Sequence, residues 1–294
     1  MSKRSGPSSS LLRFAAKILP DEGERRQFLE ALVTPLPYAP ALVWMNEPQS
    51  VFELADKPRW APDWVQFLAP GQRPGQHPLH EEGAYYVLDP SSVFSAAAFL
   101  DIQAESILDV CASPGGKSVQ AWRALQPKTL VANEVIGKRL GMLRGNLERC
   151  GVKPSEVVSL DAAKLAEDYQ DEFDLVIVDA PCSGQSLFVK GRIAPGAFMP
   201  HVIDMNAQRQ RRILANAVQC VKTGGHLAYM TCTYSREENE GTVEWLLKRF
   251  PEMSPITIDK LQGCEGLSDW PSYRLWPQRG EGAGAFVTML GKHA

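Results

Sequence analysis

The feature that most restricts the fold is an alternation, from residue 91 onward, of short apolar runs with longer stretches of helical pattern. The apolar runs are ILDVC (107–111), LVANEV (130–135), VVSLDA (157–162), FDLVIVDAP (173–181) and GHLAYMT (225–231). Helical patterns lie mainly between them, at 117–125, 137–150 and 205–221, and another follows at 238–250. Strands without polar positions are typical of a parallel sheet covered on both faces. The alternation therefore predicts an α/β fold with a doubly wound, mostly parallel sheet.

The chain before residue 91 has a different composition. Residues 11–90 are rich in Pro and Trp, and helices are expected only at 10–19 and 24–33, before Pro20 and Pro35. The opening MSKRSGPSSS is small, polar and basic. We predict a flexible tail at 1–10, a small mixed N-terminal domain at 11–90 and a second domain at 91–294 that carries the chemistry.

Composition excludes several classes of protein. A formal net charge of −3 gives no general attraction to polyanions, so a nucleic-acid site would need basic residues gathered on one face. The six cysteines have no Cys-x-x-Cys spacing, and no signal peptide is recognisable, so we expect reduced thiols in the cytoplasm and no metal site. The longest apolar runs are too short to span a bilayer, and no membrane association is expected.

Four acidic residues follow the apolar runs, and this pattern predicts a ligand site. They are Asp109, Glu134, Asp161 and Asp179. Ligands of open α/β sheets bind outside the carboxyl ends of the strands, so these carboxylates should face the ligand. They suit hydroxyls, amines or a positive charge, and they would repel a phosphate-rich ligand.

The segment LDVCASPGGKS (108–118) reads as a strand, a tight turn and the start of a helix. It is neither a dinucleotide fingerprint nor a Walker loop. Alone, Pro114-Gly115-Gly116 would more often be a simple chain reversal. Glu134, which closes the next strand, favours a ligand site because an acidic side chain there can accept both hydroxyls of a ribose. A cationic nucleoside without phosphate fits, and S-adenosylmethionine is the cofactor we expect.

Two cysteines follow neighbouring apolar runs: Cys182 in VDAPCSG and Cys232 in YMTCTYS. If the two strands are adjacent, both thiols and Asp179 converge beside the cofactor loop. A buried cysteine is usually an inert hydrophobe, and that reading suits Cys111, Cys150, Cys220 and Cys264. Near a methyl donor, however, two thiols suggest alkylation of a pyrimidine. A thiolate that adds to carbon 6 makes carbon 5 nucleophilic, and a second thiol can assist release. Spacing alone does not say which cysteine attacks.

Several motifs together resemble the NOP2/Sun family of RNA cytosine-5 methyltransferases, from about residue 83 to the C-terminus. The motifs are LDVCASPGGKS, NEVIGKRLGMLRGNLERCG, DAPCSG and TCTYSREENE, flanked by GAYYVLDPSS and RLWPQRGEGAGAFVTML. The resemblance implies a Rossmann-like S-adenosylmethionine-dependent methyltransferase fold and a bacterial enzyme of the ribosomal-RNA type.

The resemblance also implies roles for individual residues. Cys232 would be the nucleophile, Cys182 would promote product release, and Asp179 would contact ring N3 of the base. The implied cofactor-binding residues are Cys111, Ala112, Ser113, Pro114, Gly115, Gly116, Lys117, Glu134, Arg139, Asp161 and Asp179. Trp44 stands where the family usually has Arg, which leaves RNA contacts by the N-terminal domain open.

The expected partner is RNA, most simply ribosomal RNA, and the chain is expected to act as a monomer. The target base must leave its stack to reach the thiols. Lys190 and Arg192, in the loop after Cys182, are the candidates to grip the flanking phosphates. Two alternatives stay open: a methyltransferase for DNA or a small molecule, and an RNA-binding assembly factor without activity.

Overall fold

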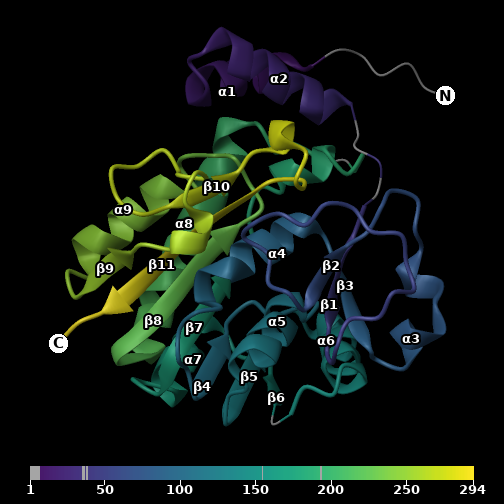
Figure 1. Ribbon diagram of the computed structural model, residues 1–294. Coiled ribbons are helices and arrows are strands. Elements are labelled where there is room, and N and C mark those ends of the chain that lie inside the picture. The colour runs from purple at the N-terminus through teal and green to yellow at the C-terminus, as the bar shows by residue number, and fades with distance from the viewer. Residues whose placement is uncertain (1–6, 35–36, 38, 154, 193) are drawn as a thin grey trace.

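The computed structural model describes residues 7–34, 37, 39–153, 155–192 and 194–294 (Figure 1). The predicted tail at 1–10 lies mostly outside the described residues. Helix α1 (Ser9–Ile18) already includes its last two residues, because the Ser8 side chain accepts from the Leu11 N–H and caps the helix there.

The larger sheet has eight strands in the order β10-β11-β8-β7-β4-β5-β6, with β9 also paired to β11. The parallel strands are β4 (Ser106–Asp109), β5 (Thr129–Asn133), β6 (Glu156–Val158), β7 (Phe173–Asp179) and β8 (Val221–Thr231). The antiparallel strands are β9 (Met253–Ile256), β10 (Tyr273–Leu275) and β11 (Ala285–Lys292). The predicted doubly wound, mostly parallel fold is confirmed, and the antiparallel edge was not predicted.

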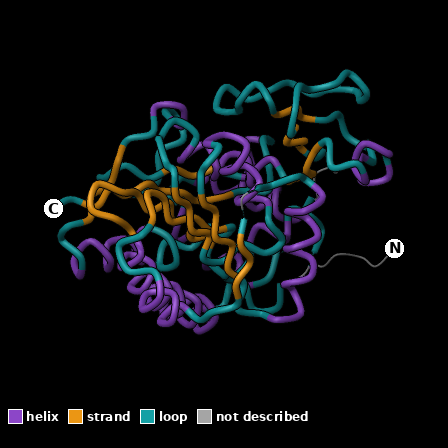
Figure 2. Tube along the Cα trace, turned by 90° about the horizontal axis from the view of Figure 1, so that it is seen from below, coloured by secondary structure: helices purple, strands orange, loops and turns teal. Residues whose placement is uncertain are grey.

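Helices cover both faces of this sheet, and Figure 2 shows them on its two sides. One face carries α4 (Pro90–Ala96), α5 (Gly116–Leu125) and α6 (Gly137–Arg149). The other carries α7 (Ala162–Asp168), α8 (Pro200–Cys220) and α9 (Glu240–Arg249). Strand β7 is apolar on both faces because both are buried. Ile177 packs in the core on the side of α4–α6, and Val176 packs in the core on the side of α7–α9. Burying such a side chain contributes roughly 1.5–3 kcal/mol.

The chain before residue 91 forms two separate pieces. A small antiparallel sheet consists of β1 (Ala41–Trp44), β2 (Val65–Phe67) and β3 (Tyr85–Leu88), next to α3 (Pro78–Glu81). Helices α1 and α2 (Glu22–Val33) instead share an apolar cluster with residues from Val189 onward; for example, Phe28 packs edge-on against Tyr234. The division at residue 90 stays a prediction.

Short 3-10 helices complete the secondary structure: η1 (Pro74–Gln76), η2 (Ala97–Phe99), η3 (Gln185–Phe188), η4 (Asp259–Leu261) and η5 (Pro277–Arg279). In the part of the chain that the structure describes, no helix is both long enough and apolar enough to cross a membrane.

Candidate active site

The two cysteines expected to converge lie side by side. Strands β7 and β8 are parallel neighbours, with Asp179 opposite Met230, so the segments that follow them leave the sheet at the same edge. The Sγ atoms of Cys182 and Cys232 are 3.2 Å apart. Cys232 is exposed and Cys182 is partly buried, so a substrate can reach the pair.

The two thiols are electrostatically unequal. The hydrogen bond from Cys182 is the largest cause that lowers the pKa of Cys232, and the same bond, together with burial, raises the pKa of Cys182. These directions favour the thiolate on Cys232, with the S–H of Cys182 as the donor. A thiolate is the nucleophilic form of cysteine.

The other four cysteines fit the expectation of inert thiols. Cys150, Cys220 and Cys264 are buried, and Cys111, in the loop that follows β4, is partly buried. Burial raises the pKa of each, that of Cys220 to about 12.

Asp179 is paired with Lys117 beside the cysteines. Lys117 Nζ lies 3.0 Å from Asp179 Oδ2 and donates to Ser92 Oγ at 2.7 Å. The lysine side chain is only 7% exposed, whereas the aspartate is 37% exposed. A nearly buried ammonium thus holds the carboxylate at the edge of the sheet, close enough to Cys232 to oppose its ionisation.

The expected cofactor loop, Cys111 to Lys117, turns directly into α5. Gly115 has φ +115°, a conformation that side-chain-bearing residues rarely adopt, and a Cβ on Gly116 would lie 2.6 Å from Leu88. Asn146 Nδ2 donates to the Pro114 carbonyl at 2.8 Å, and Arg139 donates to the Ser113 carbonyl. Helix α6 therefore holds this loop, which also includes Ala112, in place.

The predicted carboxylates differ in their surroundings. Glu134 is buried, pairs with Arg139 at 3.0 Å and accepts from the Ile136 N–H at 2.8 Å. Asp161 is exposed and caps α7 by accepting from the Lys164 N–H. Asp109 does not face the ligand side as expected. It is fully buried, and Ser118 Oγ donates to it at 2.7 Å.

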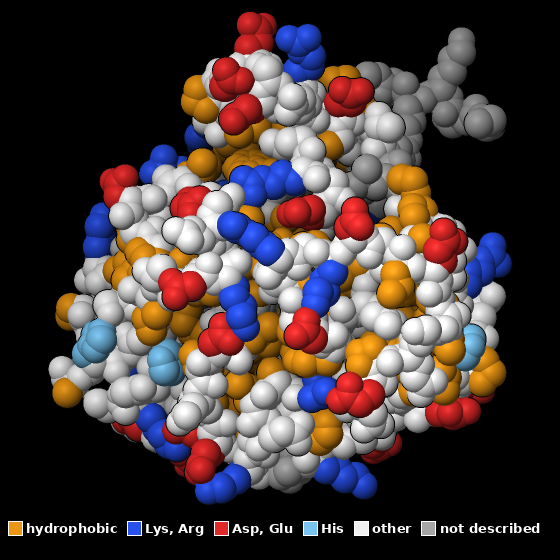
Figure 3. Space-filling view, viewed as in Figure 1, with side chains coloured by type: hydrophobic (Ala, Val, Ile, Leu, Met, Phe, Trp, Pro, Cys, Tyr) orange, Lys and Arg blue, Asp and Glu red, His pale blue; other side chains and the backbone are white. Residues whose placement is uncertain are grey.

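The two predicted RNA contacts also differ. Lys190 Nζ forms an ion pair with Asp89 Oδ2 at 3.0 Å, which joins the Cys182 loop to the start of α4. Arg192 is exposed, and no ion pair is found for it among the described residues. Basic and acidic side chains are interspersed over the face shown in Figure 3.

Residues that the sequence reasoning missed support this site. Ser92 holds Lys117, Asp89 holds Lys190, and Glu238 contacts the residues that follow both cysteines. Glu238 lies in the segment EENE (237–240), which begins five residues after Cys232, and this acidic segment was the available signal.

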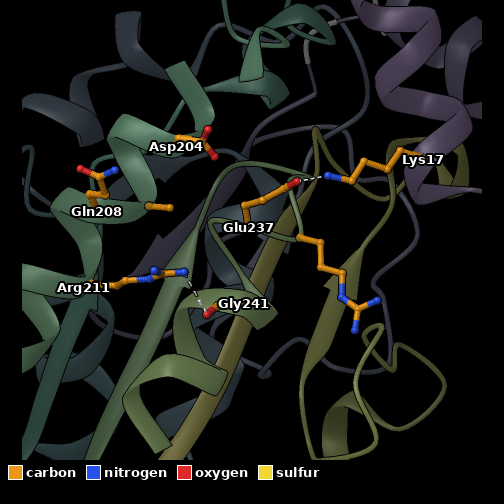
Figure 4. Close-up of a pocket in the computed structure, with 8 residues that line it drawn as sticks. Lys17, Asp204, Gln208, Arg211, Glu237 and Gly241 are labelled. Atoms are coloured by element: carbon orange, nitrogen blue, oxygen red, sulfur yellow. Dashed lines mark hydrogen bonds and ion pairs between the residues drawn. The ribbon is translucent and has the colours of Figure 1, made fainter. Parts of the chain in front are cut away.

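A groove of about 370 Å³ lies between α1, α8 and the segment that leads into α9 (Figure 4). Lys17 reaches Glu237 across it, and Arg211 points toward the Gly241 carbonyl. None of its lining residues is a predicted site residue. Among the described residues, no group of three potential metal ligands occurs.

The sheet order and the site at the carboxyl ends of its strands define a Rossmann-like fold of the methyltransferase class. Residues 97–291 match the family model described as 16S rRNA methyltransferase RsmB/F. The chain belongs to this family, which confirms the resemblance drawn from its motifs.

Curated relatives agree with this assignment, and a solved structure shares the fold. Ribosomal RNA small subunit methyltransferase F of Klebsiella pneumoniae is 33% identical over 221 residues, 73% of this chain and 46% of that protein. The Cronobacter sakazakii protein of the same name is 31% identical over 244 residues, 80% of this chain and 51% of that protein. This chain thus spans about half the length of these curated relatives. The structure of NSun6 from Pyrococcus horikoshii, 17% identical, has a TM-score of 0.83 and covers 98% of both chains, which shows the common fold.

Proposed function

We propose that this protein transfers a methyl group from S-adenosylmethionine to carbon 5 of a cytosine in ribosomal RNA through a covalent adduct with Cys232. The observation that carries the proposal is the pair of sulfurs 3.2 Å apart, beside the Lys117–Asp179 ion pair. A direct methyl transfer to carbon 5 would not need a second thiol in contact with the first.

The two thiols have different roles in the proposed reaction. The Cys232 thiolate forms a bond to carbon 6, and the displaced electron pair makes carbon 5 nucleophilic toward the methyl group. After transfer, a base in the site or a water molecule takes the carbon-5 proton, the C–H electron pair restores the double bond between carbons 5 and 6, and the sulfur–carbon bond breaks with its electron pair returning to Cys232. Cys182, in contact with Cys232, promotes this release. The higher pKa of Cys182 keeps it protonated while Cys232 attacks.

Asp179 and Lys117 are proposed to interact with the polar edge of the base. Adding sulfur to carbon 6 places negative charge on the ring, with density at N3. As a carboxylic acid, Asp179 would donate a hydrogen bond to N3, and the buried Lys117 supplies positive charge next to that contact. A fixed charge in a site shielded from water acts more strongly than it would in bulk water.

The residues present fit S-adenosylmethionine. When bound, it supplies an electrophilic methyl group on a sulfonium. Asn146 and Arg139 hold the Gly115-Gly116 turn in place, and the carboxylates of Glu134 and Asp161 suit the hydroxyls and positive charge of this cofactor rather than a phosphate. Residues 111–117, Glu134, Arg139, Asp161 and Asp179 would hold it.

RNA binding is proposed for the loop after Cys182. Arg192 is exposed and would contact phosphate, whereas Lys190 holds the loop on α4 through Asp89. The N-terminal region at 11–90 is a further candidate for RNA contact. We place the protein in the cytoplasm as a monomer, where the thiols stay reduced.

The experiment that tests the activity is transfer of radiolabelled methyl from S-adenosylmethionine to rRNA, compared with DNA of the same sequence. The expected result is 5-methylcytosine in RNA alone. Equal labelling of DNA would favour the alternative of a different base substrate. RNA binding without any labelling would favour the inactive assembly factor.

A further inference from the structure

The carboxylate of Glu238 lies between the two cysteine loops, and the reaction described above does not use it. Oε2 accepts from the Ser183 N–H at 2.9 Å and from Gln210 Nε2 at 3.0 Å. Oε1 accepts from Ser183 Oγ at 2.5 Å and from Thr233 Oγ1 at 3.4 Å. Ser183 follows Cys182 and Thr233 follows Cys232, so one side chain is bonded to the neighbour of each cysteine.

Two further amides extend this connection. Gln210 Nε2 also donates to the Pro181 carbonyl at 3.1 Å, on the other side of Cys182. Asn239 accepts from Thr231 Oγ1 at 2.6 Å and donates to the Thr233 carbonyl at 3.0 Å, and so holds both neighbours of Cys232. Of these groups, Glu238 alone contacts both loops through its side chain.

Burying a carboxylate is costly, and the cost falls only when its oxygens are fully hydrogen-bonded. Glu238 is 0% exposed, and burial raises its pKa. Its position is therefore fixed by four donors that also fix the loops. Ser183 Oγ and Thr233 Oγ1 also contact each other at 2.9 Å, so the carboxylate holds a pair of hydroxyls that joins the two loops. Moving the carboxylate would shift this pair and, with it, the two neighbouring sulfurs.

We propose that Glu238 is a positioning residue for the methyl transfer proposed above, on which this inference rests: it ties the Cys182 loop to the Cys232 loop and so sets the contact between the two sulfurs. Cys232 is the first of the two cysteines to contact the base, but release of the methylated base requires Cys182 at a defined position. A misplacement of 1 Å at a reacting group can lower the rate by about a hundredfold.

Two substitutions distinguish the hydrogen bonds that link the two loops from the negative charge of Glu238. Glu238→Gln can keep all four contacts, because its Oε1 can accept from the Ser183 N–H and Gln210 while its Nε2 donates to the two hydroxyls, which can accept. Glu238→Asp keeps the charge but is one methylene shorter, and it cannot reach both loops. Glu237→Gln is the matched control, since Glu237 contacts Lys17 and Ser235 instead.

The first readout needs neither RNA nor cofactor. Diamide oxidises two adjacent thiols to a disulfide and is itself reduced, and mass spectrometry follows the Cys182–Cys232 product. The second readout is kcat and KM for RNA. We expect Glu238→Asp to slow disulfide formation and to lower kcat by about a hundredfold without a change in KM, and Glu238→Gln and Glu237→Gln to stay within about threefold of wild type. Circular dichroism checks that each variant is folded.

Two results would overturn the proposal: wild-type rates in both assays for Glu238→Asp, or equal losses for the Gln and Asp variants. If Glu238→Asp does not fold, Ser183→Ala, which removes the 2.5 Å bond, is expected to show a smaller loss of the same kind, and wild-type rates for it would overturn the proposal. If the wild type methylates no RNA, the proposed function fails, and the disulfide rates alone then decide the role of Glu238.

Discussion

Cys182 and Cys232 are 50 residues apart in the chain, and their sulfurs are in hydrogen-bonding contact at 3.2 Å. Adjacent parallel strands produce this contact, because β7 and β8 end at the same edge of the sheet. The contact also makes the two thiols unequal, since the hydrogen bond from Cys182 lowers the pKa of Cys232.

Removing that hydrogen bond should raise the pKa of Cys232. In Cys182→Ala, the pH midpoint for alkylation of Cys232 by iodoacetamide should move upward, because only the thiolate reacts. Cys182→Ser keeps a donor and should shift the midpoint less. Mass spectrometry of the peptide that contains Cys232 gives the rate at each pH. An unchanged midpoint in Cys182→Ala would show that the hydrogen bond does not favour the thiolate.

The buried Asp109 should make stability depend on pH. Burial raises its pKa from 3.8 to about 7. Between these values the folded protein holds a proton that the unfolded chain has released, so the free energy of unfolding falls as pH rises from about 4 to 7. The contribution is fully present below pH 4 and lost above pH 7.

Asp109→Asn should flatten this decline, since an amide can still accept from Ser118 but does not ionise. Relative to wild type, the decline should be smaller by up to about 4 kcal/mol. Urea unfolding at about pH 4.5 and about pH 8, near the two ends of this pH range, measures the change in the free energy of unfolding for each protein. Parallel pH profiles for the two proteins would contradict the assignment.

The buried ion pair of Arg274 and Glu240 should be required for stability. Arg274 Nε donates to Glu240 Oε1 at 2.7 Å, and Arg274 Nη1 donates to the Tyr234 carbonyl. The side chains of Arg274 and Glu240 are both at most 2% exposed. Arg274→Ala leaves a buried carboxylate without its partner and should cost about 3–5 kcal/mol. The exposed Arg236–Glu244 pair is the control, and Arg236→Ala should cost less than about 1 kcal/mol. Denaturant unfolding measures both; equal losses would refute the argument.

Arg192 should contribute directly to RNA binding. Arg192→Glu should weaken binding and reduce the slope of log affinity against log salt concentration by about one or more. Lys128, which precedes β5 and so lies at the opposite edge of the sheet, is the control for charge reversal. Fluorescence anisotropy across a salt series measures the slope, and equal slopes for the two variants would exclude this loop from the RNA interface.

The sequence predicted the strands that carry the site, because runs such as 173–181 are apolar on both faces and end in polar residues. It also predicted that Asp179 and the two cysteines converge, since parallel strands end at a common edge. It could not predict that Asp109 is buried, because a polar residue at the end of a strand looks the same whether it faces a ligand or a helix. The hydrogen bond from Ser118, on α5, shows that Asp109 faces the helix.

The contacts of Glu238 and Lys190 were also beyond the sequence. Both depend on residues distant in the chain, Ser183 and Asp89 respectively, and no local pattern encodes such pairs. The antiparallel strands β9–β11 escaped prediction because β9 contains Pro255, β10 has only three residues, and β11 follows a segment rich in Gly, all of which are typical of loops.

In the proposed reaction, the sulfur of Cys232 bonds to the base and the sulfur of Cys182 promotes its release. The most direct measurement is denaturing electrophoresis of each cysteine variant after incubation with ribosomal RNA and S-adenosylmethionine. Cys182→Ala should accumulate a protein–RNA adduct that survives denaturation, and Cys232→Ala should form none and transfer no methyl group. An adduct in Cys232→Ala, or methyl transfer by that variant at the wild-type rate, would show that Cys232 is not the nucleophile.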